Sequence, residues 1–190
     1  MLNHWPGHQF VNSLTRTHCK KIVKRRELVC AHRHLLQLKL ECMGSFPLIL
    51  VAEDDTNDVF FLRRAFQKAE IKCQIVDVPN GQEAMRYLEG EQPYQDRQEF
   101  PRPSLLLLDL KMPLVNGFEL LEWLRLQRKF DDLPALVLSS SAHEGDMVRA
   151  RELGAREYHV KPSSLAQLTE LAQDIASKWL PEQASASKPD

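Results

Sequence analysis

The chain has 190 residues, which is enough for one well-packed domain with extensions and short for two full domains. Hydrophobic residues make up 43% of it and charged residues 27%, as expected of an ordinary globular protein. The formal net charge is −1, and no apolar run approaches the ~20 residues that span a bilayer. The sequence therefore favours neither a nucleic-acid partner nor a membrane partner.

Charge is divided unevenly along the chain. Residues 1–42 carry a net +6 and hold five of the seven His and three of the four Cys, whereas the remainder carries −7. This break predicts a basic N-terminal extension, residues 1–43, before a separate domain. Three interpretations of the extension stay open: a basic amphipathic helix, a mobile segment, and a start of translation at Met43. Residues 181–190 predict a disordered tail.

The first residues and the cysteines favour a cytoplasmic setting. The N-terminal stretch, MLNHWPGHQF, lacks the basic and apolar regions of a secretory signal. The four Cys show no close paired spacing, which favours reduced thiols and disfavours a zinc module.

Short apolar runs alternate with amphipathic stretches from residue 46 onward. Residues 46–52, FPLILVA, predict a strand that stops at Glu53-Asp54-Asp55. Residues 57–69 predict a helix, with Asp55, Thr56 or Asn57 as candidate N-caps. The apolar face expected for this helix consists of Val59, Phe60, Leu62, Phe66 and Ala69.

The next elements repeat this alternation. Residues 73–78 predict a strand, and Asn80-Gly81 precede a helix through Leu88. A polar connection over 90–103 leads to SLLLLDL, 104–110, whose unbroken apolar run indicates a strand buried on both faces. The remaining elements are a helix after Asn116-Gly117, a strand at 134–141, a helix at 143–153 ended by Gly154, a strand at 157–160 and a helix at 164–180.

Five predicted strands thus alternate with five predicted helices. This pattern predicts an α/β domain with a doubly wound, five-stranded parallel sheet and helices on both faces. Ligands of such sheets bind beyond the carboxyl ends of the strands, so the residues at those ends are the candidates for function.

Charged and hydroxyl side chains follow four of the strands. Carboxylates stand after the first strand, at Glu53 and Asp54, and after the third, at Asp109; Ser139 and Lys161 end the fourth and fifth. Clustered carboxylates suit a hard cation such as Mg²⁺, and an aspartate can attack phosphorus to form an aspartyl-phosphate. A metal and a lysine would neutralise the transferring phosphoryl oxygens.

Four segments in order resemble the response-regulator receiver family: LILVAEDD, LLLLDLKMPLVNGFELL, PALVLSSSA and LGAREYHVKP. The resemblance covers roughly residues 46–180 and implies the flavodoxin-like (receiver) fold, (βα)5. It implies that Asp109 is the phosphoacceptor, that Asp54 is a direct Mg²⁺ ligand, and that Glu53 acts through water. The main-chain carbonyl of Lys111 would complete the protein's share of the metal shell.

The resemblance also implies residues that respond to phosphorylation. Ser139 matches the switch Ser/Thr position, although Ser140 and Ser141 leave its register open by one. Tyr158 matches the aromatic switch, with simple packing as the alternative. Lys161 matches the family's lysine and would precede Pro162 through a cis peptide bond.

Two features are similar to the single-domain receivers paired with bacterial phytochrome-type histidine kinases: Glu53-Asp54 in place of Asp-Asp, and the long 90–103 connection. The resemblance therefore implies a sensor histidine kinase, of that type, or a phosphotransfer protein as partner. A homodimer through helix 143–153, strand 157–160 and helix 164–180 is a further hypothesis from it.

Two other functions were weighed against a phosphoacceptor. A phosphorylation-independent binding module would be expected to lack Asp54, Asp109 or Lys161, and all three are present. A phosphatase of the haloacid-dehalogenase type expects a second acid two residues after its nucleophile, where this chain has Lys111. Asp109 is thus expected to be a switchable acceptor rather than a turnover catalyst.

Overall fold

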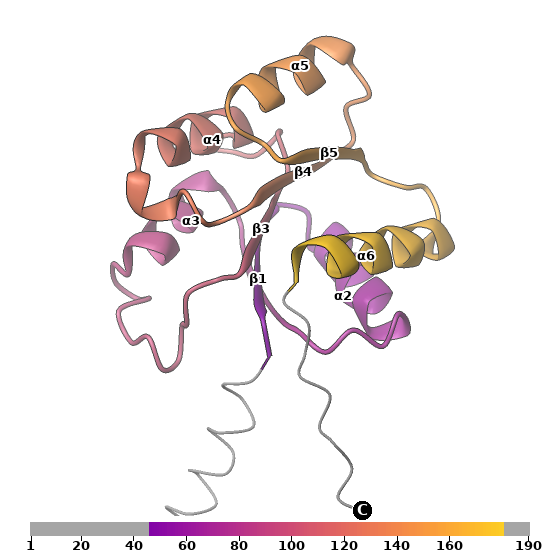
Figure 1. Cartoon of the computed structure of the whole chain (residues 1–190), viewed down its shortest axis with the longest axis horizontal. Coiled ribbons are helices and arrows are strands. Elements are labelled where there is room, and N and C mark those ends of the chain that lie inside the picture. Colours follow the sequence, from indigo (N-terminus) through magenta and orange to yellow (C-terminus); the bar gives the residue numbers. More distant parts are fainter. Residues whose placement is uncertain (1–45, 181–190) are drawn as a thin grey trace, which may run out of the picture. The chain divides into compact units, whose positions relative to one another are not determined.

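The computed structural model describes residues 46–180, and within them five parallel strands form one sheet in the order β2-β1-β3-β4-β5 (Figure 1). The strands are β1 (Leu48–Ala52), β2 (Gln74–Val78), β3 (Leu105–Leu108), β4 (Ala135–Ser139) and β5 (Glu157–Val160). The helices are α2 (Thr56–Lys68), α3 (Gly81–Glu89), α4 (Gly117–Leu126), α5 (Glu144–Glu152) and α6 (Leu165–Trp179), with a short 3-10 turn, η1, at Arg128–Phe130. The predicted doubly wound, flavodoxin-like fold is confirmed.

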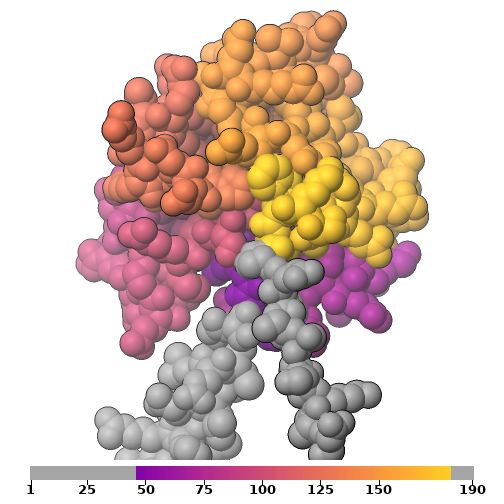
Figure 2. Space-filling model, viewed as in Figure 1, coloured from indigo at the N-terminus to yellow at the C-terminus, as the bar shows by residue number. Residues whose placement is uncertain are grey.

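Helices cover both faces of the sheet because the central strands are apolar on both sides. In β3, Leu106 and Leu108 enter one hydrophobic cluster, whereas Leu105 and Leu107 enter the other. Helices α3, α4 and α5 close the first cluster, and α2 and α6 close the second (Figure 1). In the space-filling view of Figure 2, little of the indigo segment that includes β1 is visible at the surface. Alternate residues of each central strand are therefore buried against different helices.

Helix α2 begins one residue earlier than expected. Asp55 is its N-cap, and the Asp55 carboxylate accepts a hydrogen bond of 2.8 Å from the Asn57 backbone N–H. The expectation that Phe60 belongs to the apolar face was wrong, since Phe60 is 58% exposed. Val59 and Phe66 define the buried stripe, and Phe60 lies about 100° around the helix from Val59, which turns it to solvent.

The predicted cis peptide bond at Lys161–Pro162 was also wrong. The cis bond within residues 46–180 is Gln92–Pro93, in the connection between α3 and β3. The two isomers of an X–Pro bond differ by only about 0.5–1 kcal/mol, so the surrounding packing decides between them.

Three sequence predictions lie outside the described residues: the basic extension 1–43, its boundary near Met43, and the disordered tail 181–190. In the described part of the chain, no helix has the length and apolar character that crossing a membrane requires.

Candidate functional site

The register of β1 and β3 brings the acidic strand ends together. Ala52 pairs with Leu108, and the Asp109 N–H donates a 2.9 Å hydrogen bond to the Ala52 carbonyl. Glu53 follows Ala52, so the side chains of Glu53 and Asp109 leave neighbouring strands at the same edge. Glu53, Asp54 and Asp109 each offer a carboxylate oxygen, and these oxygens lie within 4.8 Å of one another.

The three acids differ in their exposure to solvent. Asp109 is 5% exposed and Glu53 is 8% exposed, whereas Asp54 is exposed. Burial raises the pKa of Glu53, and the Lys161 ammonium partly opposes this rise. An oxygen-only donor set of negative charge fits a hard divalent cation, which would relieve the repulsion among the acids. The three acids therefore have the ligand chemistry of a divalent-metal site.

Lys161 reaches this cluster from the end of β5. Its N–H donates to the Ser139 carbonyl at 2.8 Å, which anchors the lysine backbone beside β4. Its Nζ donates to Glu53 Oε2 at 2.7 Å and lies 3.7 Å from Asp109 Oδ2. Burial lowers the pKa of Lys161, but the hydrogen bonds and negative charges around it outweigh that effect and leave the pKa raised. The ammonium thus stays charged at the edge of the pocket.

Sequence reasoning missed Asp58. Its Oδ2 accepts a hydrogen bond of 2.6 Å from Lys161 Nζ, although the two residues are 103 positions apart. Asp58 is an acid in the first turn of the helix that follows Glu53. The position of Asp58 in the sequence could have predicted this contact, because helix α2 begins at the same edge of the sheet where Glu53 follows β1.

The candidate switch residues occupy neighbouring strands. Ser139 ends β4 and is completely buried, whereas Ser140 is exposed. Tyr158, on β5, donates a 2.8 Å hydrogen bond from its hydroxyl to the Ser141 carbonyl. Burial raises the pKa of Tyr158, so its hydroxyl keeps its proton and remains a donor.

The loop between β4 and α5 is tied at both ends. Ser141 Oγ donates to Asp146 Oδ2 at 2.6 Å, which joins the loop to the first turn of α5. The Ser141 N–H lies 3.4 Å from Ser139 Oγ, its acceptor. Ser139, Ser141 and Tyr158 therefore belong to one hydrogen-bonded group.

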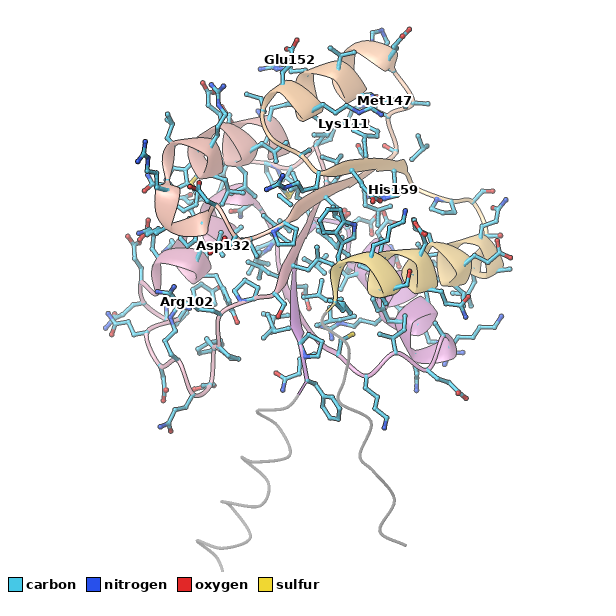
Figure 3. All side chains as sticks on the ribbon, viewed as in Figure 1. Arg102, Lys111, Asp132, Met147, Glu152 and His159 are labelled. Atoms are coloured by element: carbon cyan, nitrogen blue, oxygen red, sulfur yellow. The ribbon has the colours of Figure 1, made fainter. Side chains whose placement is uncertain are left out.

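Close packing fixes the loop that carries the candidate acceptor. A Cβ at Gly117 would stand 2.2 Å from the Asp109 carbonyl oxygen, a distance that only glycine avoids. The Asp109 carboxylate also accepts a 2.7 Å hydrogen bond from the Leu110 N–H. Lys111, labelled in Figure 3, is exposed on the same loop. Its carbonyl as a metal ligand remains a prediction.

Comparison with known proteins agrees with this geometry. The response regulator receiver domain matches residues 49–173. Response regulator Rcp1 of Synechocystis is 30% identical over 133 residues, which cover 70% of this chain and 88% of Rcp1. This chain belongs to the response-regulator receiver family.

Solved structures of the family are similar over most of the described residues. The response regulator RPA3017, in red light signaling of R. palustris, has a TM-score of 0.68 at 30% identity and covers 72% of this chain and 99% of its own. The phosphorylated cyanobacterial phytochrome response regulator RcpA has a TM-score of 0.65 at 30% identity over 72% of this chain and 99% of its own. Rcp1 has also been solved in a Mn²⁺-bound form, with a TM-score of 0.63 at 28% identity, covering 76% of this chain and 99% of its own.

Family membership defines the class of activity. The chain is a two-component response-regulator receiver, a phosphoacceptor signalling protein rather than a turnover enzyme, and its class implies a histidine kinase as partner. The acidic pocket of Glu53, Asp54 and Asp109 is of the metal-binding kind typical of receivers.

Proposed function

We propose that this chain acts as a single-domain response regulator that takes a phosphoryl group from a phosphohistidine onto Asp109 with Mg²⁺. The observation that carries the proposal is the pocket itself. A buried aspartate stands among two further acids and 3.7 Å from a lysine ammonium, at the carboxyl ends of β1, β3 and β5.

The proposed transfer needs no general base, because an aspartate is ionised at neutral pH. A carboxylate oxygen of Asp109 attacks the phosphorus atom. The new P–O bond forms as the P–N bond to the imidazole breaks, and the imidazole leaves with the electron pair of that bond and takes a proton from solvent. The Lys161 ammonium neutralises negative charge on the transferring oxygens.

Magnesium fits the donor set as a hard cation that binds carboxylate oxygens together with phosphate. Its proposed protein ligands are Asp54, Asp109 and the Lys111 carbonyl, with Glu53 acting through water. When bound, the ion would supply positive charge to the phosphoryl oxygens. The Mn²⁺-bound form of Rcp1 supports the binding of a divalent ion by a receiver similar to this chain.

Readout is assigned to Ser139 and Tyr158. A phosphoryl group on Asp109 would offer an acceptor for the buried Ser139 hydroxyl, at the end of the next strand of the sheet. A shift of Ser139 would displace Ser141, whose carbonyl accepts the Tyr158 hydroxyl. This is a two-state element biased by one local charge.

The partner is proposed to be a phytochrome-type histidine kinase, or a phosphotransfer protein, in the cytoplasm. The support is similarity to RcpA, named as a phytochrome response regulator, and to bacteriophytochrome response regulators. A homodimer through α5, β5 and α6 is part of the proposal. Val148 on α5 and Val160 on β5 are exposed apolar side chains on that face.

The direct test is labelling with a small phosphodonor, acetyl phosphate, and Mg²⁺, followed by intact-mass measurement. The wild type is expected to gain one phosphoryl group, and Asp109→Asn is expected to gain none because an amide is not a nucleophile here. Asp77→Asn is the control for charge removal, since Asp77 pairs with Arg63 on α2. Equal labelling of Asp109→Asn and the wild type would contradict the proposal.

A further inference from the structure

Lys161 Nζ lies beside three carboxylates and donates hydrogen bonds to two of them. It donates to Asp58 at 2.6 Å and to Glu53 at 2.7 Å. Asp109 Oδ2, at 3.7 Å, is beyond hydrogen-bond distance. The side chain expected to serve the acceptor is thus held by two other acids.

Asp58 holds the lysine from outside the acidic cluster. Its side chain is 41% exposed, against 7% for Glu53, and among the described residues the close carboxylate group contains Glu53, Asp54 and Asp109 but not Asp58. The Asp55 cap fixes the first turn of α2, and Asp58 lies in that turn. Asp58 therefore draws the ammonium toward α2, away from β3.

Lys161 also has room to change partners. A cavity of about 130 Å³ lies beside it, with Glu53, Asp58 and Asp109 in its lining. Apolar side chains, among them Leu62 and Leu165, complete the wall. Because this cavity is not filled by side chains, the Lys161 ammonium can move toward Asp109 without displacing α2 or α6.

We propose that Asp58 is a positioning residue that competes with the phosphoryl group for Lys161. This inference rests on the proposed acceptor role of Asp109. In the unphosphorylated protein Asp58 restrains the ammonium, and phosphorylation must draw it away. Asp58 thereby weakens the hold of the pocket on a phosphoryl group and sets how far the phosphorylated state is favoured.

The test is the affinity for BeF₃⁻, a non-covalent phosphoryl mimic, at saturating Mg²⁺. Asp58→Asn keeps the size of the side chain and removes the charge that holds Lys161. Loss of one partly exposed ion pair corresponds to an affinity gain of about twofold to fivefold. Asp58→Glu restores the charge and is expected to return the affinity toward that of the wild type. Asp77→Asn, which removes a charge that pairs with Arg63 rather than with Lys161, is expected to leave it unchanged.

The gain in BeF₃⁻ affinity must also depend on the presence of Lys161. In a Lys161→Met background, Asp58→Asn is expected to change BeF₃⁻ affinity by less than about twofold, since no ammonium remains to be released. An equal gain in both backgrounds would overturn the proposal, because it would show a general effect of charge.

A readout without metal or mimic is the NMR signal of the Lys161 ammonium protons. Two carboxylates protect these protons from exchange in the metal-free wild type, so the signal is expected to be visible and to broaden in Asp58→Asn. An unchanged signal would also overturn the proposal. If the wild type binds BeF₃⁻ no better than Asp109→Asn, the acceptor role itself fails. If the wild type binds and Asp58→Asn matches it, only the role of Asp58 fails.

Discussion

Leu114 combines two unfavourable properties at a single residue. Its φ of 63° lies in the left-handed region, and its side chain is 77% exposed. A left-handed conformation costs an L-residue roughly 1–2 kcal/mol, and asparagine tolerates it better than leucine does. The residue therefore stores strain in the loop between β3 and α4, next to the pocket.

Leu114→Asn is expected to raise the free energy of unfolding by about 0.5–1 kcal/mol, because it relieves this strain and removes no buried contact. Urea denaturation measures the change. Leu126→Asn is the matched control, since Leu126 is equally exposed at 71% but has no positive φ. A variant at 114 that is no more stable than the wild type would show that the loop relaxes around leucine without cost.

For individual residues, the sequence predicted the acids of the pocket but not all of the contacts that they make. Glu53, Asp54 and Asp109 follow apolar strands, and a parallel sheet brings such ends together whatever the side chains do. Asp58 reaches Lys161 from a helix, and that contact depends on side-chain length and on the angle of α2. A sequence pattern carries neither quantity.

The connection between α3 and β3 is an ordered element in its own right. Arg97 donates to the carbonyls of Tyr87 and Leu88, at the end of α3, and to the carbonyl of Phe100. Tyr94 and Phe100 pack against Tyr87. The arginine thus satisfies the Leu88 carbonyl at the end of the helix and adds a second donor to the Tyr87 carbonyl, which also accepts from the Gly90 N–H.

Arg97→Ala is expected to lower the free energy of unfolding by about 1–3 kcal/mol, because three partly buried carbonyls lose a charged donor. Arg97→Lys is expected to recover only part of the loss, since lysine lacks the planar fork. Thermal denaturation measures both. Arg102→Ala is the control, as Arg102 is exposed on the same connection (Figure 3). Equal shifts at 97 and 102 would mean that the hydrogen bonds add nothing beyond charge.

Element boundaries show where the sequence pattern stops being informative. Residues 157–160 were predicted as a strand, and β5 has those bounds. The strand predicted over 104–110 is shorter at both ends, since β3 covers Leu105–Leu108 and the chain turns into the pocket loop after Asp109. An apolar run reports burial and not pairing, so Leu110 was counted as strand although it is only buried.

Two groups, the buried Tyr87 and the partly buried Cys73, make the stability of the domain sensitive to alkaline pH. Burial raises the pKa of Cys73 from 9.0 to about 11 and that of Tyr87 from 10.0 to about 12. A raised pKa means that the folded state holds its proton longer than the unfolded state. The stabilisation is complete below the unfolded pKa and is lost as pH rises through the folded pKa.

The free energy of unfolding is therefore expected to fall between pH 9.0 and about pH 12, the interval that these two groups span. Urea denaturation across this range measures the slope. Cys73→Ala and Tyr87→Phe together are expected to flatten it, although Tyr87→Phe loses the hydrogen bond to the Pro101 carbonyl at every pH. A slope as steep in the double variant as in the wild type would assign the decline to other groups.

The parallel sheet between two helical layers followed from the alternation of the sequence, whereas the flavodoxin-like fold was implied by the resemblance to the receiver family. Apolar runs of four to seven residues separated by amphipathic stretches admit few arrangements other than a parallel sheet between two helical layers. The sequence did not predict the isomer of the Lys161–Pro162 peptide bond correctly, because the choice between cis and trans depends on small packing energies.

The order of the strands gives the sheet a stiff centre and a compliant edge. β3, which leads into Asp109, is clamped by β1 and β4, whereas β5 is held on one side by β4. β5 carries Tyr158 and leads directly into Lys161. Displacing β5 breaks one ladder rather than two. If Asp109 accepts a phosphoryl group as proposed, we expect the change of charge at the centre of the sheet to move β5 at its edge, where another protein can sense it.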